Sequence, residues 1–335
     1  MKKHIASILF LFLLSTFQLI AQSHSVKRLG IEQGLSNNYV VSITQDKQGF
    51  LWFATEEGLN KFDGTRFTTY YKNDLTQDNQ GITGNELNRV YADTKHPIIW
   101  IATQRDGLNA YNYNEQTFTA YQHNPENPHS LITNDVTDIA PSTQHDDGLW
   151  ISTYYRGIEY LDITSGQFTH YNKSTVPSLP CDQTWTVLDG GDGNLYIGHV
   201  GSGFSIFSPK DKSVKNFRNE AGNPMSLPGN DVFCIIKDAN GNIWLGTNNG
   251  LALYDAANEN FIMFKNNKND KYATLCSRIL SIRQLKDNRL WIASELNGIA
   301  ILNLKQSMFL SPEEISLEYI QEGADNRSLS NASAR

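Results

Sequence analysis

Hydrophobic and polar positions along this chain follow a unit that returns about every 48 residues. Each unit has an apolar run around one aromatic anchor, and the intervals between anchors are 48, 50, 46, 48 and 47 residues. The anchors are Trp52, Trp100, Trp150, Tyr196, Trp244 and Trp291. A glycine follows each run, at Gly58, Gly107, Gly157, Gly203, Gly250 and Gly298. A fixed period of this length indicates a repeat protein, in which each unit buries its apolar faces against its neighbours.

The fifth unit is the clearest and predicts four short strands. Residues 232–237 are rich in β-branched and aromatic residues, which favours a first strand. Residues 238–242 have the glycine and polar residues of a hairpin loop. Further strands are expected at 243–247, 251–254 and 261–264. The 3.6-residue period of an amphipathic helix does not occur in this unit or the others.

Four antiparallel strands in about 48 residues predict a β-propeller blade, and therefore an all-β fold. Six complete blades are expected near residues 36–70, 83–121, 132–171, 180–217, 228–264 and 275–309. The last of these takes Phe309 as its fourth strand. Because an aromatic anchor occupies the same slot in every blade, we expect the anchors to pack between blades rather than to bind a ligand.

The two ends of the repeat region are incomplete. Residues 26–29, before Gly34, predict a fourth strand that has no blade of its own. Residues 310–335, with the lead-in Ser328-Leu329-Ser330-Asn331, predict the start of a truncated seventh blade. Propellers often close by pairing a strand from the start of the domain with strands from its end. We therefore expect an open or incomplete ring, in a chain that is a fragment or shortened form of a longer protein.

The first 22 residues resemble an export signal. Lys2 and Lys3 precede an apolar run over residues 5–20, and Ala21-Gln22-Ser23 follows it. This pattern predicts a cleaved signal peptide over residues 1–22 and a propeller over 23–335, with an uncleaved membrane anchor as the alternative. The formal charge of −7 becomes −9 without the two lysines. An acidic chain of this kind argues against nucleic acid as a partner.

The repeat sequence is similar to the two-component regulator propeller repeat, most clearly over residues 35–63 and 231–255. The opening Gly34-Leu35-Ser36-Asn37-Asn38-Tyr39-Val40 resembles the start of sensor regions in hybrid two-component histidine kinases. The resemblance implies a periplasmic module that senses oligosaccharides, in a parent protein anchored in the inner membrane. It also implies a second propeller and a β-sandwich domain as partners within the parent, and a homodimer as a further assembly. The kinase, receiver and DNA-binding modules of such parents have no counterpart in this sequence.

Candidate ligand contacts lie in the loops between second and third strands, because these loops differ from repeat to repeat while their flanks recur. Aromatic faces can stack on sugar rings, and arginine offers a fork of donors to hydroxyl or carboxylate groups. The candidates are Tyr154, Tyr155, Arg156, Arg105, Gln104, Glu56, His199, Asn248 and Glu295. The alternative is that they are ordinary loop residues or contacts to a missing second propeller. In addition, Arg89 and Asp138 occupy equivalent first-strand positions and are expected to pair in the channel.

Two other functions remain open at this point. The propeller can act only as a protein–protein assembly or dimerisation scaffold, with the ligand bound elsewhere. Catalysis as a lyase or hydrolase is the less favoured reading, because among the eight histidines only His199 falls in a central-face loop. A zinc site needs three or four convergent ligands. We therefore predict no catalytic residues, no metal site and no cofactor.

Overall fold

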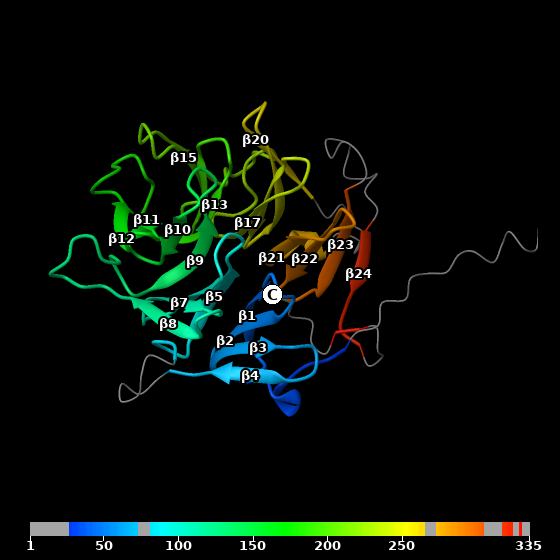
Figure 1. The fold of residues 1–335 in the computed structure, drawn as a ribbon. Helices are drawn as coiled ribbons and strands as arrows, with labels where there is room; N and C mark the ends of the chain where they lie inside the picture. Colours follow the sequence, from blue (N-terminus) through cyan, green and yellow to red (C-terminus); the bar gives the residue numbers. More distant parts are fainter. Residues whose placement is uncertain (1–26, 73–80, 265–272, 305–316, 324–327, 330–335) are drawn as a thin grey trace, which may run out of the picture.

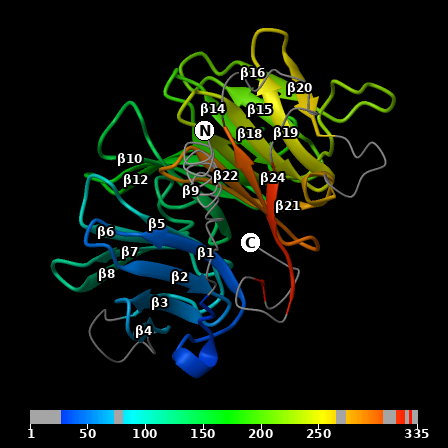
Figure 2. The ribbon, with the colours of Figure 1, turned by 90° about the vertical axis from the view of Figure 1, so that its right-hand side faces the viewer.

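The structure is a computed structural model that describes residues 27–72, 81–264, 273–304, 317–323 and 328–329. These residues form six four-stranded antiparallel sheets. Short 3-10 segments at Ile31–Gln33 and Thr274–Cys276 are the helical elements described. The sheets follow one another in chain order around an axis (Figures 1 and 2). The predicted all-β propeller of four-stranded blades is confirmed, while the predicted signal peptide lies outside the described residues.

The blades share one meander order, in which each strand pairs with the next. The first two blades comprise β1 (Val40–Gln45), β2 (Leu51–Thr55), β3 (Gly58–Phe62), β4 (Phe67–Tyr70), β5 (Leu87–Ala92), β6 (Ile98–Thr103), β7 (Leu108–Asn112) and β8 (Thr117–Tyr121). The next two comprise β9 (Val136–Pro141), β10 (Gly148–Thr153), β11 (Gly157–Asp162), β12 (Gln167–Tyr171), β13 (Thr184–Asp189), β14 (Leu195–His199), β15 (Phe204–Phe207) and β16 (Val214–Phe217). The last two comprise β17 (Val232–Lys237), β18 (Ile243–Thr247), β19 (Gly250–Asp255), β20 (Asn260–Met263), β21 (Ile279–Gln284), β22 (Arg289–Ser294), β23 (Ile299–Asn303) and β24 (Leu317–Ile320).

Hydrophobic packing between neighbouring sheets holds the blades together. Separate clusters of buried residues join blade 1 to 2, 2 to 3, 3 to 4, 4 to 5 and 5 to 6. Five of the six aromatic anchors, all except Trp291, lie in these clusters, and Trp52, Trp100 and Trp244 are fully buried. An aromatic side chain of this size contributes a large share of the apolar area that folding removes from water. The expectation that the anchors are packing residues is therefore confirmed for these blades.

The hairpin aspartates cap their own turns and hold the anchors in place. The Asp46 carboxylate accepts hydrogen bonds from the backbone N–H groups of Gln48 and Phe50 and, at 2.7 Å, from the indole of Trp52. Asp238 makes the same set of contacts and accepts from the indole of Trp244 at 2.9 Å. The buried indole N–H therefore has a partner, as a buried donor requires. These loop carboxylates are explained by turn geometry and not by cation binding.

The recurring glycine makes the tight turn into each third strand possible. Gly58 has a φ of 101°, a conformation that L side chains rarely adopt. A Cβ added to it would lie 2.8 Å from the carbonyl oxygen of Tyr70. All six recurring glycines have a positive φ, so this turn is the same in every blade.

Two strand predictions at the ends of the repeats are wrong. The fourth strand of blade 6 is β24, which pairs with β23 through Leu302 and Leu317, so this blade extends beyond 309. Phe309 itself lies outside the described residues. Residues 27–30 form no strand, and Ile31–Gln33 after them is a 3-10 turn. Arg28 instead donates a hydrogen bond to the Gly323 carbonyl at 3.3 Å, beside the exit of blade 6.

Blades 1 and 6 lie at the two ends of this packed series. Ile43 on β1 is 44% exposed, whereas its counterparts Val90, Ile139, Val187, Ile235 and Ile282 are at most 6% exposed. On the other side, Trp291 of blade 6 is partly exposed, although the five other anchors are buried. Among the described residues, no core cluster joins blade 6 to blade 1. This arrangement agrees with the expected open or incomplete ring.

The passage out of blade 6 repeats the passage out of blade 1. Leu329 forms a parallel bridge with Glu322, as Ile82 does with Lys72 before blade 2.

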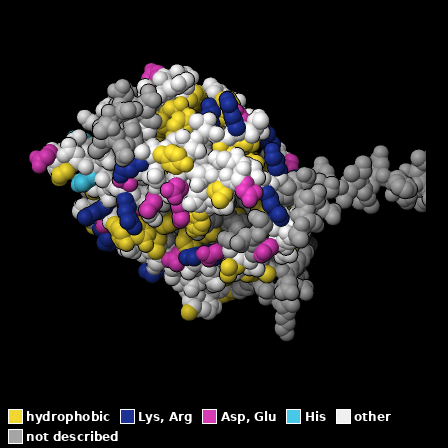
Figure 3. Space-filling model, turned by 90° about the horizontal axis from the view of Figure 1, so that it is seen from below, with side chains coloured by type: hydrophobic (Ala, Val, Ile, Leu, Met, Phe, Trp, Pro, Cys, Tyr) yellow, Lys and Arg dark blue, Asp and Glu magenta, His cyan; other side chains and the backbone are white. Residues whose placement is uncertain are grey.

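The outer side of the molecule near blade 1 carries interspersed acidic, basic and apolar side chains (Figure 3). No helix within the described ranges is long and apolar enough to cross a bilayer.

Candidate ligand-binding site

A β-bulge in the first strand of every blade shapes the centre of the ring. In blade 1 the pairing with β2 shifts between Val40 and Ser42, and the same shift recurs in the other five blades. A bulge leaves one extra residue out of the ladder and redirects its side chain. The bulge residues are Val41, Asn88, Thr137, Trp185, Phe233 and Leu280, and all six line one axial cavity of about 840 Å³.

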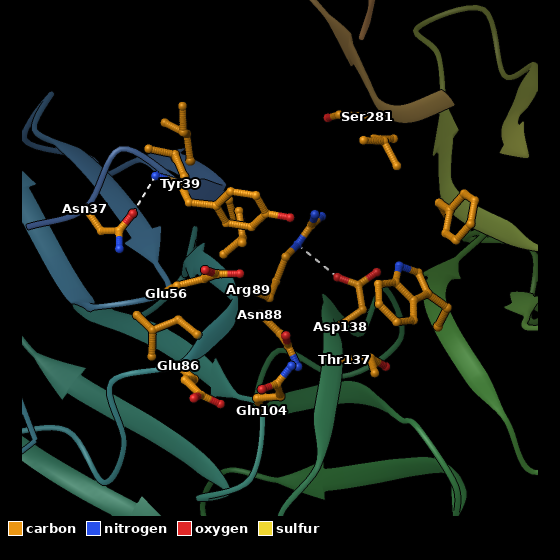
Figure 4. A pocket seen from close by; sticks show the side chains of 18 of the residues that line it. Asn37, Tyr39, Glu56, Glu86, Asn88, Arg89, Gln104, Thr137, Asp138 and Ser281 are labelled. Carbon is orange, nitrogen blue, oxygen red and sulfur yellow. Dashed lines mark hydrogen bonds and ion pairs between the residues drawn. The ribbon is translucent and has the colours of Figure 1, made fainter. Parts of the chain in front are cut away.

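An ion pair lies in this cavity. Arg89 Nε is 2.9 Å from Asp138 Oδ1, which confirms the pairing expected from sequence. Figure 4 shows Arg89 between Tyr39 and Asp138. Asp138 is 5% exposed and also accepts hydrogen bonds from its neighbour strand, from Thr186 Oγ1 at 2.6 Å and Val187 N at 3.3 Å. Its carboxylate therefore ties blades 2, 3 and 4 together at the axis.

Aromatic rings form a row across blades 3 to 5 at one side of the cavity. Tyr155 and Tyr154 have centroids 4.2 Å apart, and Trp185 lies 6.0 Å from Tyr154. Phe233 lies 6.0 Å from Trp185, and the Arg278 guanidinium lies 4.7 Å from the Phe233 ring. The contacts at Trp185 are edge-on, at interplanar angles of 80° and 88°, which is a favoured geometry for aromatic pairs. Trp185 and Phe233 are partly exposed and line the cavity.

Four of the predicted residues lie at the rim. Glu56, Gln104, Arg105 and Glu295 line the cavity, so the loops between second and third strands do open on the same side as the bulges. Glu295 is tied to Arg278, with Nη1 distances of 3.2 and 3.1 Å to its two carboxylate oxygens. Glu56 and Arg105 are exposed.

The other five predicted residues do not line the cavity. Tyr154 contacts Trp185, which lines the cavity, but does not line it itself. Tyr155 is 55% exposed on the surface next to Tyr154. Arg156 and Asn248 are exposed loop residues outside the lining. His199 is fully buried, so its predicted place in a surface loop is wrong. The imidazole Nε2 lies 2.8 Å from Ser205 Oγ, and burial lowers the pKa of His199 to about 4.

Sequence reasoning missed the bulge residues Trp185 and Phe233 and the cavity arginines Arg278 and Arg283. The signal was present, because the second position of the first strand differs in every repeat while the position before it stays apolar or small. Side chains of a regular strand alternate between the two faces of the sheet, whereas the bulge places this side chain in the cavity. The described residues contain no group of three or more His, Cys, Asp or Glu side chains placed to hold a metal ion.

Comparisons with known proteins agree with the repeat pattern. The family described as two component regulator propeller matches residues 34–57 and 226–249. The two matched segments are two-component regulator propeller repeats. A 66-residue part of the chain, 20% of its length, is 42% identical to histidine kinase P4 of Formosa agariphila and covers 5% of that protein.

Several solved structures are similar to this propeller. The extracellular domain of a hybrid two component system from B. thetaiotaomicron is 62% identical over 93% of this chain, with a TM-score of 0.82. The chain spans 39% of the length of that domain. A second extracellular domain from B. thetaiotaomicron, at 22% identity and a TM-score of 0.67, shares the fold, and so does virginiamycin B lyase of Staphylococcus aureus at 13% and 0.59. The described residues are those of a propeller, and no kinase module is among them.

Proposed function

We propose that this chain is the ligand-recognition part of a periplasmic two-component sensor, and that its axial cavity binds an oligosaccharide. The observation that carries the proposal is the row of aromatic rings beside a polar, charged cavity. The similarity to the extracellular domain of a hybrid two component system supports the sensor role. In a longer parent protein, ligand binding would bias the arrangement of paired sensors and so the activity of a kinase across the membrane.

The cavity suits a small oligosaccharide in size and chemistry. Its volume of about 840 Å³ lies within the roughly 300–1,000 Å³ typical of small-molecule sites. Trp185 and Phe233 provide apolar ring surface for the C–H faces of a sugar. Asn88, Gln104 and Glu86, which lie together in Figure 4, provide donors and acceptors for hydroxyl groups. A site of mixed aromatic and amide lining is typical of sugar recognition more than of a purely apolar ligand.

The proposal is tested by binding measurements on the purified chain with a library of neutral and acidic oligosaccharides. Isothermal titration should find a ligand whose affinity falls by roughly 1 to 3 kcal/mol in Trp185→Ala, with a smaller loss in Trp185→Phe. The Tyr154→Ala, Tyr155→Ala double variant should show a loss of similar or smaller size. Leu285→Ala, an exposed apolar truncation on the hairpin loop after β21, is the matched control. Binding that is equal in the wild type and Trp185→Ala would remove the cavity from consideration.

A second candidate function is assembly, and exposed apolar side chains favour it. Ile31 and Ile43 of the blade 1 region are 57% and 44% exposed, and Leu285 and Leu296 of blade 6 are 42% and 71% exposed. Such side chains, gathered on two blades, are suited to contact another protein surface. Assembly would appear as a concentration-dependent molar mass in light scattering without any ligand. Ligand binding would instead raise the melting temperature at constant mass.

A further inference from the structure

A second arginine lies in the cavity near the Arg89–Asp138 pair. Arg283 on β21 lines the cavity, and its counterparts in the other blades are uncharged: Thr44, Tyr91, Ala140, Leu188 and Ile236. Within the described ranges, Arg283 has no carboxylate at ion-pair distance. Its guanidinium therefore has no hydrogen-bond acceptor among the residues that the structure describes.

Asp138 has no capacity left for Arg283. Its Oδ1 accepts from Arg89 Nε and from the backbone N–H of Ile139, and its Oδ2 accepts from Thr186 and Val187. The carboxylate of Asp138 therefore pairs with Arg89 and not with Arg283. Arg283 is exposed at the cavity, so its guanidinium is accessible to an anion from solution.

We propose that the ligand of the axial cavity is an anionic saccharide, whose carboxylate or sulfate ester binds Arg283 together with the terminal nitrogens of Arg89. This inference rests on the proposed function and narrows its ligand class. An arginine fork binds either anion through two parallel hydrogen bonds, so the two anions share one recognition chemistry. Asp138 holds Arg89 through Nε only, which leaves the terminal nitrogens facing the cavity.

The remaining cavity residues fit the same ligand. At the rim, Glu295 is neutralised by Arg278, while Glu56, Glu57 and Glu86 belong to the side of blades 1 and 2. The aromatic row lies on the opposite side, across blades 3 to 5. The acidic rim can accept hydrogen bonds from hydroxyl groups, and the arginines are left to bind the anionic group. This division orients an acidic sugar with its charge toward the axis.

The test compares matched pairs of ligands that differ only in the anion. Glucuronate is paired with its methyl ester, and N-acetylglucosamine 6-sulfate with N-acetylglucosamine, and inorganic sulfate is titrated alone. Binding is followed by ligand-observed NMR in the wild type, Arg283→Gln and Arg283→Lys. Arg66→Gln removes the same charge from an exposed turn and is the control. We expect binding of the acidic member of a pair to weaken roughly ten- to a hundredfold in Arg283→Gln and to fall as salt rises.

The outcomes distinguish the anionic ligand from oligosaccharide binding in general. A preference for glucuronate or for the sulfated sugar identifies the anion, and a response to sulfate alone supports the arginine site without the sugar. Equal binding of the acidic and neutral members, unaffected by Arg283→Gln but lost in Trp185→Ala, overturns the anionic ligand while oligosaccharide binding stands. An absence of binding by any acid or anion in the wild type also overturns it. Failure of every saccharide in the library overturns both.

Discussion

Arg89 on β5 and Asp138 on β9 form an ion pair across the boundary of blades 2 and 3, with 2.9 Å between Nε and Oδ1. The two side chains differ in exposure, because the Arg89 side chain is 34% exposed and that of Asp138 is 7% exposed. Asp138 is also held by β13, so this one carboxylate connects the first strands of three successive blades. The pair therefore contributes to the structure of the cavity wall as well as to its charge.

Replacing Asp138 should destabilise the fold more than replacing Arg89. Asp138→Asn leaves Arg89 without its counter-charge and places amide hydrogens among four donors, so we expect a loss of about 3 kcal/mol in the free energy of unfolding. Arg89→Gln should cost about 1 kcal/mol, because its side chain reaches water. Urea unfolding measures both, with Glu115→Gln in the exposed β7–β8 turn as control. A loss below 1 kcal/mol for Asp138→Asn would show that the pair is not structural.

The two ends of the blade series should differ in their sensitivity to truncation. Ile282→Ala removes a side chain that is 2% exposed in the core between blades 5 and 6, and should cost about 3 kcal/mol. Ile43→Ala removes the equivalent side chain of blade 1, which is 44% exposed, and should cost about 1 kcal/mol or less. Urea titrations of the two variants provide the comparison. Equal losses would mean that Ile43 is covered in solution.

His199 should make the protein less stable in acid. Its pKa is lowered by burial to about 4, from an ordinary value of 6.5, so stability from the neutral ring is complete above pH 6.5 and is lost as the pH falls to 4. The shift corresponds to roughly 3 kcal/mol. His199→Thr restores the residue found at Thr55, Thr103, Thr153 and Thr247 and should remove this part of the pH dependence.

The measurement for His199 is the difference in unfolding free energy between pH 7 and pH 4, in wild type and variant. The other titrating groups are common to both proteins, so they cancel in the comparison. The variant should be less stable at pH 7 because it leaves a cavity where the ring was. An unchanged slope with pH would show that the ring is already protonated or accessible in the folded state.

The Glu159–His170 pair should act with the opposite sign. Glu159 is fully buried, with Oε2 3.5 Å from His170 Nδ1, and its presence raises the pKa of His170, while burial raises the pKa of Glu159. A histidine whose pKa is higher in the folded protein than in the unfolded chain stabilises the folded state at low pH. The contribution of His170 to stability is therefore complete below its pKa in the unfolded chain, near 6.5. It is lost as the pH rises through the higher folded value.

Glu159→Gln tests this because the amide oxygen can still accept the hydrogen bond that Ile132 N donates to Glu159 at 2.9 Å. In the wild type the free energy of unfolding should fall above pH 6.5, and this fall should be absent in the variant. In histidine NMR spectra the His170 ring of the variant should titrate at a lower pH. Since His170 is only half-buried, we expect the change in stability to be modest. A His170 titration that is the same in both proteins would contradict the assigned cause.

The repeated units made most of the fold predictable. Strand starts at Val40, Leu87, Val136, Thr184, Val232 and Ile279 agree with the structure, because hairpin turns and alternating apolar positions fix the register locally. Blade 6 departs from the rule because a long segment separates β23 from β24. Phe309 satisfies the spacing of the other blades, but pairing of Leu317 with Leu302 and partial packing of Leu317 and Tyr319 on the core select the later segment.

The site was less predictable, for a geometric reason. Loop residues such as Glu56 and Gln104 could be placed from repeat alignment, since loops joining the same strands lie on the same side of every blade. The burial of His199 could not be predicted from repeat alignment, because it depends on the volume around Ser205 and Cys181 in this blade alone. The inward direction of Trp185 and Phe233 depends on bulges; alignment of the repeats shows that this position varies, but it does not show the direction of the side chain.

Three of the bulges separate recognition from folding. A side chain at a bulge lies outside the ladder of backbone pairs, and Trp185, Phe233 and Leu280 also lie outside the hydrophobic clusters between sheets. The other three bulge residues contact a neighbouring blade: Val41 packs on the cluster between blades 1 and 2, Asn88 donates a hydrogen bond to the Val136 carbonyl, and Thr137 donates one to the Thr184 carbonyl. A protein built this way can acquire a new ligand by single substitutions at Trp185, Phe233 or Leu280. Its evolution toward another ligand would proceed through these three positions while the packing between blades stays unchanged.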